Sequence, residues 1–235
     1  MKNLIPILFS FAFLCFGCKT DNEIEDNCYS DLLFDQSRGD CNVLLAVEPL
    51  FSMDIVGTDR IISSNNIPNH PVGSFGQGPG SLNPNIISAQ NENYIIPLNP
   101  SLSQSLTPLL STSGPDLGPT YSFGIMLNGV ELDPVAAEPF PHNGNLHDEN
   151  NNWEWNKEAL NVNLGLDCNG AHVQPNGKYH YHAIPTYYFE DLPINQMSLV
   201  GFAADGFPVY ARYGFSDPND PVSYTHLTLP TKRIV

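Results

Sequence analysis

The chain has 235 residues, and its 25 aspartate and glutamate residues outnumber its 9 lysine and arginine residues to give a formal net charge of −16. Such a charge argues against binding of nucleic acid or of anionic lipid through a basic surface. The sequence contains no phosphate-binding loop, dinucleotide fingerprint or nucleophile elbow, so no nucleotide cofactor is expected.

The first 18 residues predict export. A short cationic start is followed by an apolar run over residues 4–16. This run is shorter than the ~20 residues that cross a bilayer and has the length of a signal-peptide core. Gly17 before Cys18 resembles a bacterial lipoprotein cleavage box. We therefore predict a signal peptide over residues 1–18, with Cys18 lipidated as the membrane anchor of an outer-membrane or cell-surface protein. An ordinary signal peptide, giving a periplasmic or secreted protein, is the alternative.

Residues 19–60 are predicted to form an acidic tether and an N-terminal segment ahead of the main domain. Because cysteines of exported proteins tend to form disulfides, Cys28 and Cys41 are predicted to close a small loop. This pairing leaves Cys168 without a partner, and an odd cysteine in an exported protein needs an explanation.

The predicted fold is mainly β: a compact single domain of short strands with many proline and glycine turns and one or two short helices. The 21 prolines, the 18 glycines and the 14% of charged residues support this class. Strands are expected at residues 43–47, 94–98, 121–127, 130–135, 199–204 and 207–213, with turns at 128–129 and 205–206 and the best short helix at 153–160. Pro97 indicates an edge strand or a strand end.

The tetrapeptide Tyr-His-Tyr-His at residues 179–182 alternates with the period of a strand. In an extended segment this alternation points both histidines to one face and both tyrosines to the other. The Pro-Asn-Gly sequence at residues 175–177 predicts a tight turn that folds His172 back beside the pair. His172, His180 and His182 are therefore the main candidate metal ligands. Imidazole suits Zn or Cu, and three nitrogens leave a coordination position for water or a substrate.

The segment LGLDCNGAHVQPNGKYHYHAIP resembles the YHYH-domain family of exported proteins. Further blocks resemble that family in the same order, namely NNIPNHPVGSFG, FGIMLNGVELDPVAAEPF, WEWNKEALN and LVGFAADGFPVYARYGF. On this resemblance we predict a YHYH domain at residues 61–221. What the resemblance implies about function is modest, because the biochemical role of the family is largely uncharacterised and a fold does not give a function.

Residues 222–235, VSYTHLTLPTKRIV, do not resemble the family, whose members continue with a second motif similar to LDCNGAH…YHYH. The string resembles a translated sequencing adapter. We therefore predict a non-native tail and a missing native C-terminal part, which would have held the partner of Cys168. A genuine divergent terminus is the alternative.

Three further metal ligands are proposed from their place in the family-like blocks: His70, Asp205 and Glu138. Each has a plainer interpretation, with His70 as a turn residue, Asp205 as a turn former and Glu138 as a solvated edge residue. The sequence leaves catalysis open. If the site acts on a small-molecule substrate, Glu138 or Asp205 would serve as the general base.

A non-catalytic surface module is the competing interpretation. A glycan or protein ligand could bind an aromatic platform formed by Trp153, Trp155, Tyr187 and Tyr188, although aromatic residues are also ordinary core material. In a third interpretation the tetrapeptide only organises a hairpin. Asp167 and Asn169 are in any case expected to bond nearby backbone groups through their side chains.

Overall fold

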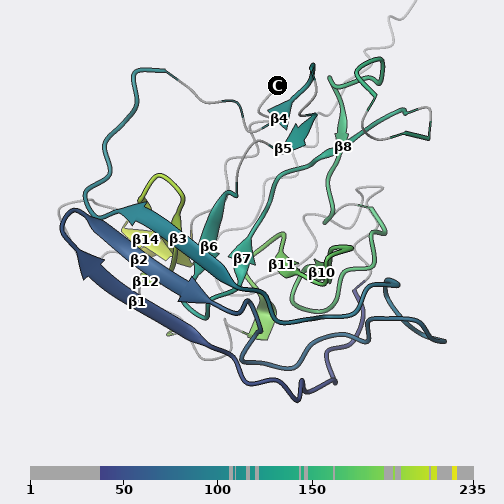
Figure 1. Ribbon diagram of the computed structural model, residues 1–235, viewed down its shortest axis with the longest axis horizontal. Coiled ribbons are helices and arrows are strands. Elements are labelled where there is room, and N and C mark those ends of the chain that lie inside the picture. Colours follow the sequence, from purple (N-terminus) through teal and green to yellow (C-terminus); the bar gives the residue numbers. More distant parts are fainter. Residues whose placement is uncertain are drawn as a thin grey trace, which may run out of the picture. The chain divides into compact units, whose positions relative to one another are not determined.

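The computed structural model describes residues 38–226 without 106–107, 109, 115–116, 120–121, 143, 146–147, 161, 188–192, 194–196, 212 and 216–223 (Figure 1). They belong to one compact unit, Phe34–Val235. The predicted signal peptide, the lipidated Cys18, Cys28 and the end of the predicted tail lie outside the described residues. No helix in the described part of the chain is long and apolar enough to cross a membrane.

The fold is mainly β, as the composition predicts. The described strands are β1 (Phe51–Val56), β2 (Asp59–Ser64), β3 (Glu92–Pro97), β4 (Leu110–Ser111), β5 (Gly118–Pro119), β6 (Gly124–Met126), β7 (Glu131–Leu132), β8 (Glu138–Pro139), β9 (Asn156–Lys157), β10 (Ala171–Val173), β11 (Tyr179–Tyr181), β12 (Ser198–Ala203), β13 (Pro208–Ala211), β14 (Tyr213–Phe215) and β15 (Tyr224–His226). Three two-stranded ribbons, β4-β5, β8-β9 and β14-β15, accompany two larger sheets.

Most of the predicted strands are present. β3, β6, β7, β12 and β13 fall within or overlap the expected ranges, and β6 and β7 pair as the predicted hairpin. The expected strand at residues 43–47 is reduced to one bridge between Val43 and Val72.

The largest sheet has the order β10-β11-β7-β6-β12-β13 and holds the main core. Its neighbouring strands are antiparallel except for β11 and β7, which are parallel. Completely buried side chains of this core include Met126, Val130, Tyr179, Tyr181 and Val200. Because alternate residues of a strand point to opposite faces, packing of the two tyrosines into the core fixes the direction of the histidines between and after them.

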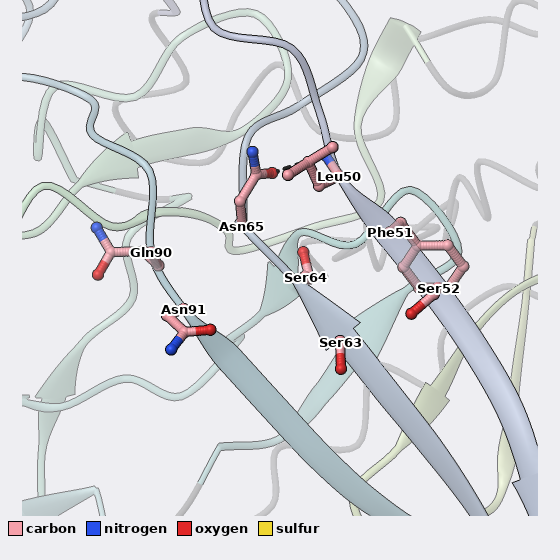
Figure 2. A pocket seen from close by; sticks show the side chains of 8 residues that line it. All are labelled: Leu50, Phe51, Ser52, Ser63, Ser64, Asn65, Gln90 and Asn91. Atoms are coloured by element: carbon pink, nitrogen blue, oxygen red, sulfur yellow. Dashed lines mark hydrogen bonds between the residues drawn. The ribbon is translucent and has the colours of Figure 1, made fainter.

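A second sheet has the order β1-β2-β3, with β1 and β3 at its edges (Figure 1). The sequence prediction lacks its β1–β2 hairpin, in which the chain reverses at Gly57 with a φ of 63° that glycine adopts without strain. This sheet packs onto the central one through a second buried cluster of Ile62, Ile96, Ile125 and Phe202. An open hollow of about 370 Å³ lies at one end of the sheet, lined by Leu50, Phe51, Ser52, Ser63, Ser64, Asn65, Gln90 and Asn91 (Figure 2).

The predicted helix at residues 153–160 is wrong. Its first two residues lie in a turn, and Asn156–Lys157 form β9, which pairs with β8. The segment is shorter than the ~12 residues that an isolated helix needs, so cross-strand pairing overrides its helical propensity. Among the described residues, helical conformation is confined to Thr186 and Tyr187.

The predicted pairing of Cys28 with Cys41 is also wrong, because Cys41 is bonded to Cys168. The Cα atoms of these two cysteines lie 5.6 Å apart, although 127 residues separate them in sequence. Next to the bond, Gly39 and Asp167 form a parallel bridge that aligns the two segments. Cys168 therefore has a partner, and the odd cysteine no longer supports a missing C-terminal part. The foreign tail itself stays a prediction.

Candidate metal centre

β10 and β11 form the predicted hairpin (Figure 1). Gly177, with a φ of 85°, donates its N–H to the carbonyl of Gln174 at 2.8 Å. The N–H of Gln174 donates to the carbonyl of Lys178 at 2.9 Å and closes the turn. The register places His172 directly opposite His180, so both side chains share one face.

His182 continues the histidine face beyond the end of β11. Its backbone N–H donates to the carbonyl of Gly170 at 2.9 Å, which extends the pairing of the hairpin by one residue. As a result the three imidazoles converge. The Nε2 of His182 lies 3.1 Å from the Nε2 of His180 and 3.1 Å from the Nε2 of His172.

These separations fit a nitrogen-only metal site. Zn–N bonds of about 2.0–2.1 Å in tetrahedral geometry place ligand nitrogens about 3.3 Å apart, close to what the rings already adopt. Among the described histidine, cysteine, aspartate and glutamate residues, only these three form a group close enough to share one ion. The predicted convergence of His172, His180 and His182 is therefore confirmed.

The second ring nitrogens, Nδ1, of the three histidines differ in their hydrogen bonds, and that of His172 shows which of its nitrogens is left for a metal. The Nδ1 of His172 lies 2.9 Å from the carbonyl oxygen of Leu164, so Nδ1–H donates there and leaves the Nε2 lone pair free. The Nδ1 of His180 lies 3.5 Å from the carbonyl oxygen of Lys178. The buried Nδ1 of His182 has no hydrogen-bond partner among the described residues.

Burial favours the neutral form of His180 and His182. His180 is 2% exposed and His182 is 9% exposed. Burial, with repulsion from the neighbouring imidazoles, holds the pKa of His180 well below its ordinary value. Burial, followed by the effects of His172 and Arg38, lowers the pKa of His182 to about 3. Neutral imidazoles keep their lone pairs available near pH 7, as metal ligation requires.

Lys178 lies on the same face, two residues before His180. Its Nζ is 2.6 Å from a carboxylate oxygen of Glu131 and 2.7 Å from one of Glu92. Burial alone would lower the pKa of Lys178, but bonds to the two glutamates outweigh it and raise the pKa. These ion pairs connect the hairpin to β7 and β3. Sequence reasoning missed this residue, although its spacing of two from His180 places it on the histidine face.

The structure does not bring the other three predicted ligands into the histidine cluster. Glu138 lies in β8, and Asp205 lies in the turn before β13, where it accepts a hydrogen bond from the N–H of Phe207 at 3.4 Å. The ring of His70 lies on the opposite face of β11, with its Nε2 2.5 Å from the hydroxyl of Tyr181. Membership of a sequence block does not tell on which face of a sheet a side chain lies.

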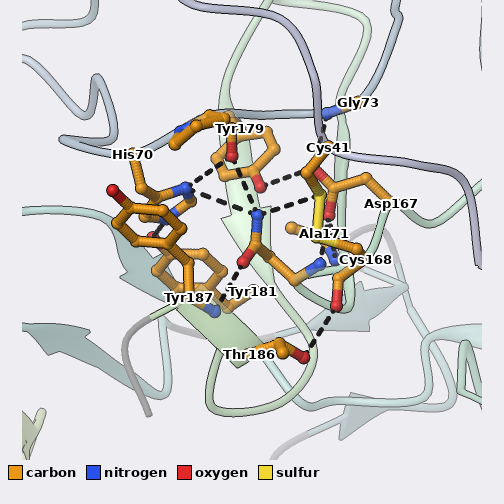
Figure 3. Close-up of a disulfide and its surroundings, with 12 residues drawn as sticks. Cys41, His70, Gly73, Asp167, Cys168, Ala171, Tyr179, Tyr181, Thr186 and Tyr187 are labelled. Carbon is orange, nitrogen blue, oxygen red and sulfur yellow. Dashed lines mark hydrogen bonds between the residues drawn. A yellow bond between two sulfur atoms is a disulfide. The ribbon is translucent and has the colours of Figure 1, made fainter. Parts of the chain in front are cut away.

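The tyrosine face of β11 is a buried hydrogen-bond network beside the disulfide (Figure 3). The hydroxyl of Tyr179 donates to the carboxylate of Asp167 at 2.8 Å. The same carboxylate accepts backbone N–H bonds of 2.9–3.3 Å from Gly73, Asn169 and Ala171. Burial raises the pKa of Asp167, against the effect of these bonds. The four donors explain how a fully buried carboxylate is tolerated here.

Asn169 connects several segments of this network. Its Nδ2 donates to the carbonyl of Pro71 at 3.1 Å and lies 3.2 Å from the Sγ of Cys41, while its Oδ1 accepts the N–H of Tyr187 at 3.1 Å. The predicted local side chain–backbone bond of Asp167 is present, whereas the side chain of Asn169 bonds backbone groups of distant segments instead of a nearby turn. The tyrosine face thus has a structural role.

A protein-family model described as YHYH protein matches residues 93–231, which is more than half of the chain. The chain belongs to the YHYH protein family. The matched YHYH region contains the hairpin with all three histidines, whereas β1, β2 and His70 precede it. The predicted domain bounds of residues 61–221 stay a prediction. No curated protein and no solved structure matches the chain.

Proposed function

We propose that this YHYH protein binds a transition metal, Zn or Cu, through His172, His180 and His182. The observation that supports it is the convergence of three Nε2 atoms, from the half-buried His172 and the buried His180 and His182, with two separations of 3.1 Å on one face of a hairpin. Neutral nitrogen donors favour Zn and Cu over Mg²⁺ and Ca²⁺, which prefer oxygen ligands.

The residues around the triad prepare it for this role. The carbonyl of Leu164 orients the ring of His172, and the hairpin register holds His172 opposite His180 before any ion arrives. A bound ion would supply Lewis-acid chemistry or, for copper, electron transfer. Neither Glu138 nor Asp205 belongs to the histidine cluster. The proposed function is therefore metal binding, without a general base.

Metal titration of the full chain tests the proposal. The metal-free protein is titrated with Zn²⁺ and with Cu⁺ or Cu²⁺ against a chromophoric chelator, and bound metal is counted by elemental analysis. Binding of one ion per chain is expected, with a loss of affinity of at least about 100-fold in His180→Ala and His182→Ala. His142→Ala, at an exposed histidine outside the hairpin, is the matched control and should bind as the parent does. Equal binding by parent, control and both hairpin variants would refute the proposal.

We also propose that the protein is exported and anchored by a lipid on Cys18. The cationic start, the apolar run at residues 4–16 and the Gly17–Cys18 step support it. In a bacterial host grown with an alkyne-tagged fatty acid, the parent and Cys15→Ala should carry label in the membrane fraction, whereas Cys18→Ala should not. If the parent chain took up no label, lipidation of Cys18 would be refuted, and an ordinary signal peptide would be the remaining interpretation.

A pair of exposed aromatic side chains supports a second candidate function, the binding of a glycan or protein ligand. The N–H of Phe140 donates to the carbonyl of Trp155 at 2.8 Å, so these residues lie opposite each other at the end of the β8-β9 ribbon. They are 55% and 62% exposed. Trp153, by contrast, is partly buried and donates its Nε1–H to the carbonyl of Asp148 at 3.2 Å. Tyr188 lies outside the described residues.

A glycan array with the full chain separates this candidate from metal binding. Binding that survives His180→Ala but is lost in both Phe140→Ala and Trp155→Ala would support the aromatic pair, since stacking on a sugar ring needs the exposed rings. If the parent chain bound no glycan on the array, glycan binding by the aromatic pair would be refuted.

A further inference from the structure

The second sheet ends in an apolar edge strand. β1 is the outermost strand in the order β1-β2-β3, and all six of its residues are exposed. Within the described part of the chain, no strand pairs with its outer edge. Leu50, Ile55 and Val56 are 64%, 65% and 60% exposed. A largely apolar edge of this length, with Asp54 as its one charged residue, is a template for another strand, and native proteins usually cover such an edge or charge it more heavily.

The hydrogen bonds at the start of β1 fix which backbone groups face outward. The N–H of Asn65 donates to the carbonyl of Leu50 at 3.1 Å, and the N–H of Leu50 donates to Oδ1 of Asn65 at 2.9 Å (Figure 2). Leu50 therefore directs its backbone groups toward β2. Since direction alternates along an antiparallel ladder, Phe51, Met53 and Ile55 direct their N–H and C=O groups to the free edge.

These outward groups are complementary to a second copy of themselves. When two β1 strands run antiparallel about a two-fold axis at Met53, Phe51 pairs with Ile55 and Met53 pairs with Met53. Each is a pair of residues with outward backbone groups, and the three pairs form about six N–H···O=C bonds. A shift by two residues in either direction breaks one of these pairs.

The side chains select the same register. Leu50 comes opposite Val56, and Phe51 comes opposite Ile55, so exposed apolar groups cover one another. Asp54 comes opposite Ser52. A shift that brings Asp54 opposite Asp54 of the second copy places two like charges face to face, which is unfavourable. Hydrogen bonding, apolar contact and charge therefore favour one arrangement.

We propose that the protein self-associates through β1 as a two-fold symmetric dimer in which two three-stranded sheets join into one. The other edge of the sheet does not compete, because Pro97 in β3 lacks an N–H donor and Glu92 and Asn93 are polar. A self-complementary patch on one edge closes on itself and gives a dimer without continuing into a fibre. This inference is independent of the proposed metal site.

The strength of the dimer follows from the size of the edge. A six-residue edge covers less than the ~800 Å² per partner of a standard stable interface. We therefore expect dissociation constants in the micromolar range. Analytical ultracentrifugation of the full chain from about 1 to 200 µM, with a chelator present to prevent bridging by metal ions, should show a monomer–dimer equilibrium.

Two substitutions at Met53 test the register. In Met53→Cys the new thiols meet across the axis, with Cα atoms about 5.5 Å apart, within disulfide range, so mild oxidation should give a covalent dimer. Ile95→Cys, at a residue of the other edge strand that is 70% exposed, is the matched control, and the parent shows the background from its own cysteines. Met53→Pro removes one outward N–H and leaves the bonds to β2, so it should weaken dimerisation about 10-fold or more with an unchanged melting temperature. A parent that stays monomeric at 200 µM, or Met53→Cys that cross-links no faster than Ile95→Cys, would overturn the proposal.

Discussion

The two faces of β11 carry similar numbers of polar side chains but satisfy them in different ways. On the tyrosine face, Tyr179 donates to Asp167, and the hydroxyl of Tyr181 accepts a bond from Asn128. On the histidine face, three Nε2 atoms point at one another. Buried acceptors that converge in this way are stabilised by a shared cation. Side-chain alternation along one strand thus separates a structural network from the proposed metal site.

The largest expected effect comes from the disulfide on the tyrosine face. Serine at both Cys41 and Cys168 removes a cross-link over 127 residues, for which the chain-entropy model gives about 4–5 kcal/mol. Urea unfolding of the metal-free chain measures this loss. Folded variant protein should still bind metal with the stoichiometry of the parent. Loss of less than about 1 kcal/mol would show that the bond constrains little of the unfolded chain.

Asp167→Ala is expected to cost about 3 kcal/mol, because it leaves the hydroxyl of Tyr179 and three backbone N–H groups without their acceptor. Asp205→Ala, in an exposed turn, is the matched control and should change stability by less than about 0.5 kcal/mol. Chemical unfolding of the two variants compares them directly. If both variants lost a similarly small amount of unfolding free energy, the buried network around Asp167 would contribute little to stability.

Acid should act through the histidine face. The pKa of His182 is about 3 in the folded chain, below the ~6.5 of an unfolded chain, so the folded state binds fewer protons in this range. The stability present above pH ~6.5 is therefore lost as the pH falls toward 3. His182→Gln removes this contribution, so the stability of the parent relative to the variant should fall by about 2 kcal/mol between pH 6.5 and 5. The free energy of unfolding of both proteins is measured against pH with a chelator present. If it changed with pH equally in the parent and in His182→Gln, the lowered pKa would be contradicted.

Tyr181→Phe should have the smallest effect, about 1–2 kcal/mol, because it removes the hydroxyl that contacts Asn128 and His70 but keeps the ring packed. Thermal unfolding measures this loss. The affinity for Zn²⁺ should stay within about two-fold of the parent, in contrast to His180→Ala. A large loss of affinity in Tyr181→Phe would show that the two faces are not separate.

The hairpin and its histidine cluster could be predicted because every feature that specifies them is local. A period of two over residues 179–182 and a turn at residues 175–177 suffice to bring His172 opposite His180. The mainly β class follows from composition in the same way. The ranges of β6 and β12 are marked by apolar runs that end in glycine turns, and β7 is predicted as the return strand after the first of these turns.

The errors concern long-range contacts. Closeness in sequence favoured Cys28 as the partner of Cys41. Cys41 is instead bonded to Cys168, next to the bridge between Gly39 and Asp167, and no local sequence pattern encodes this long-range contact. Residues 153–160 carry helix formers, but pairing with β8 decides their conformation. His70 belongs to a segment without strand periodicity, so its face could not be read from the sequence.

The Nδ1 of His182, which has no hydrogen-bond partner among the described residues, would affect the selectivity of the proposed metal site. His172 cannot turn its ring without losing the carbonyl of Leu164, whereas no described residue restrains the ring of His182 in this way. A metal site in which one ligand ring, that of His182, can reorient would accommodate ions of different radius. The metal bound at this site would then be decided more by which metal ions are available around the protein than by selectivity of the protein itself.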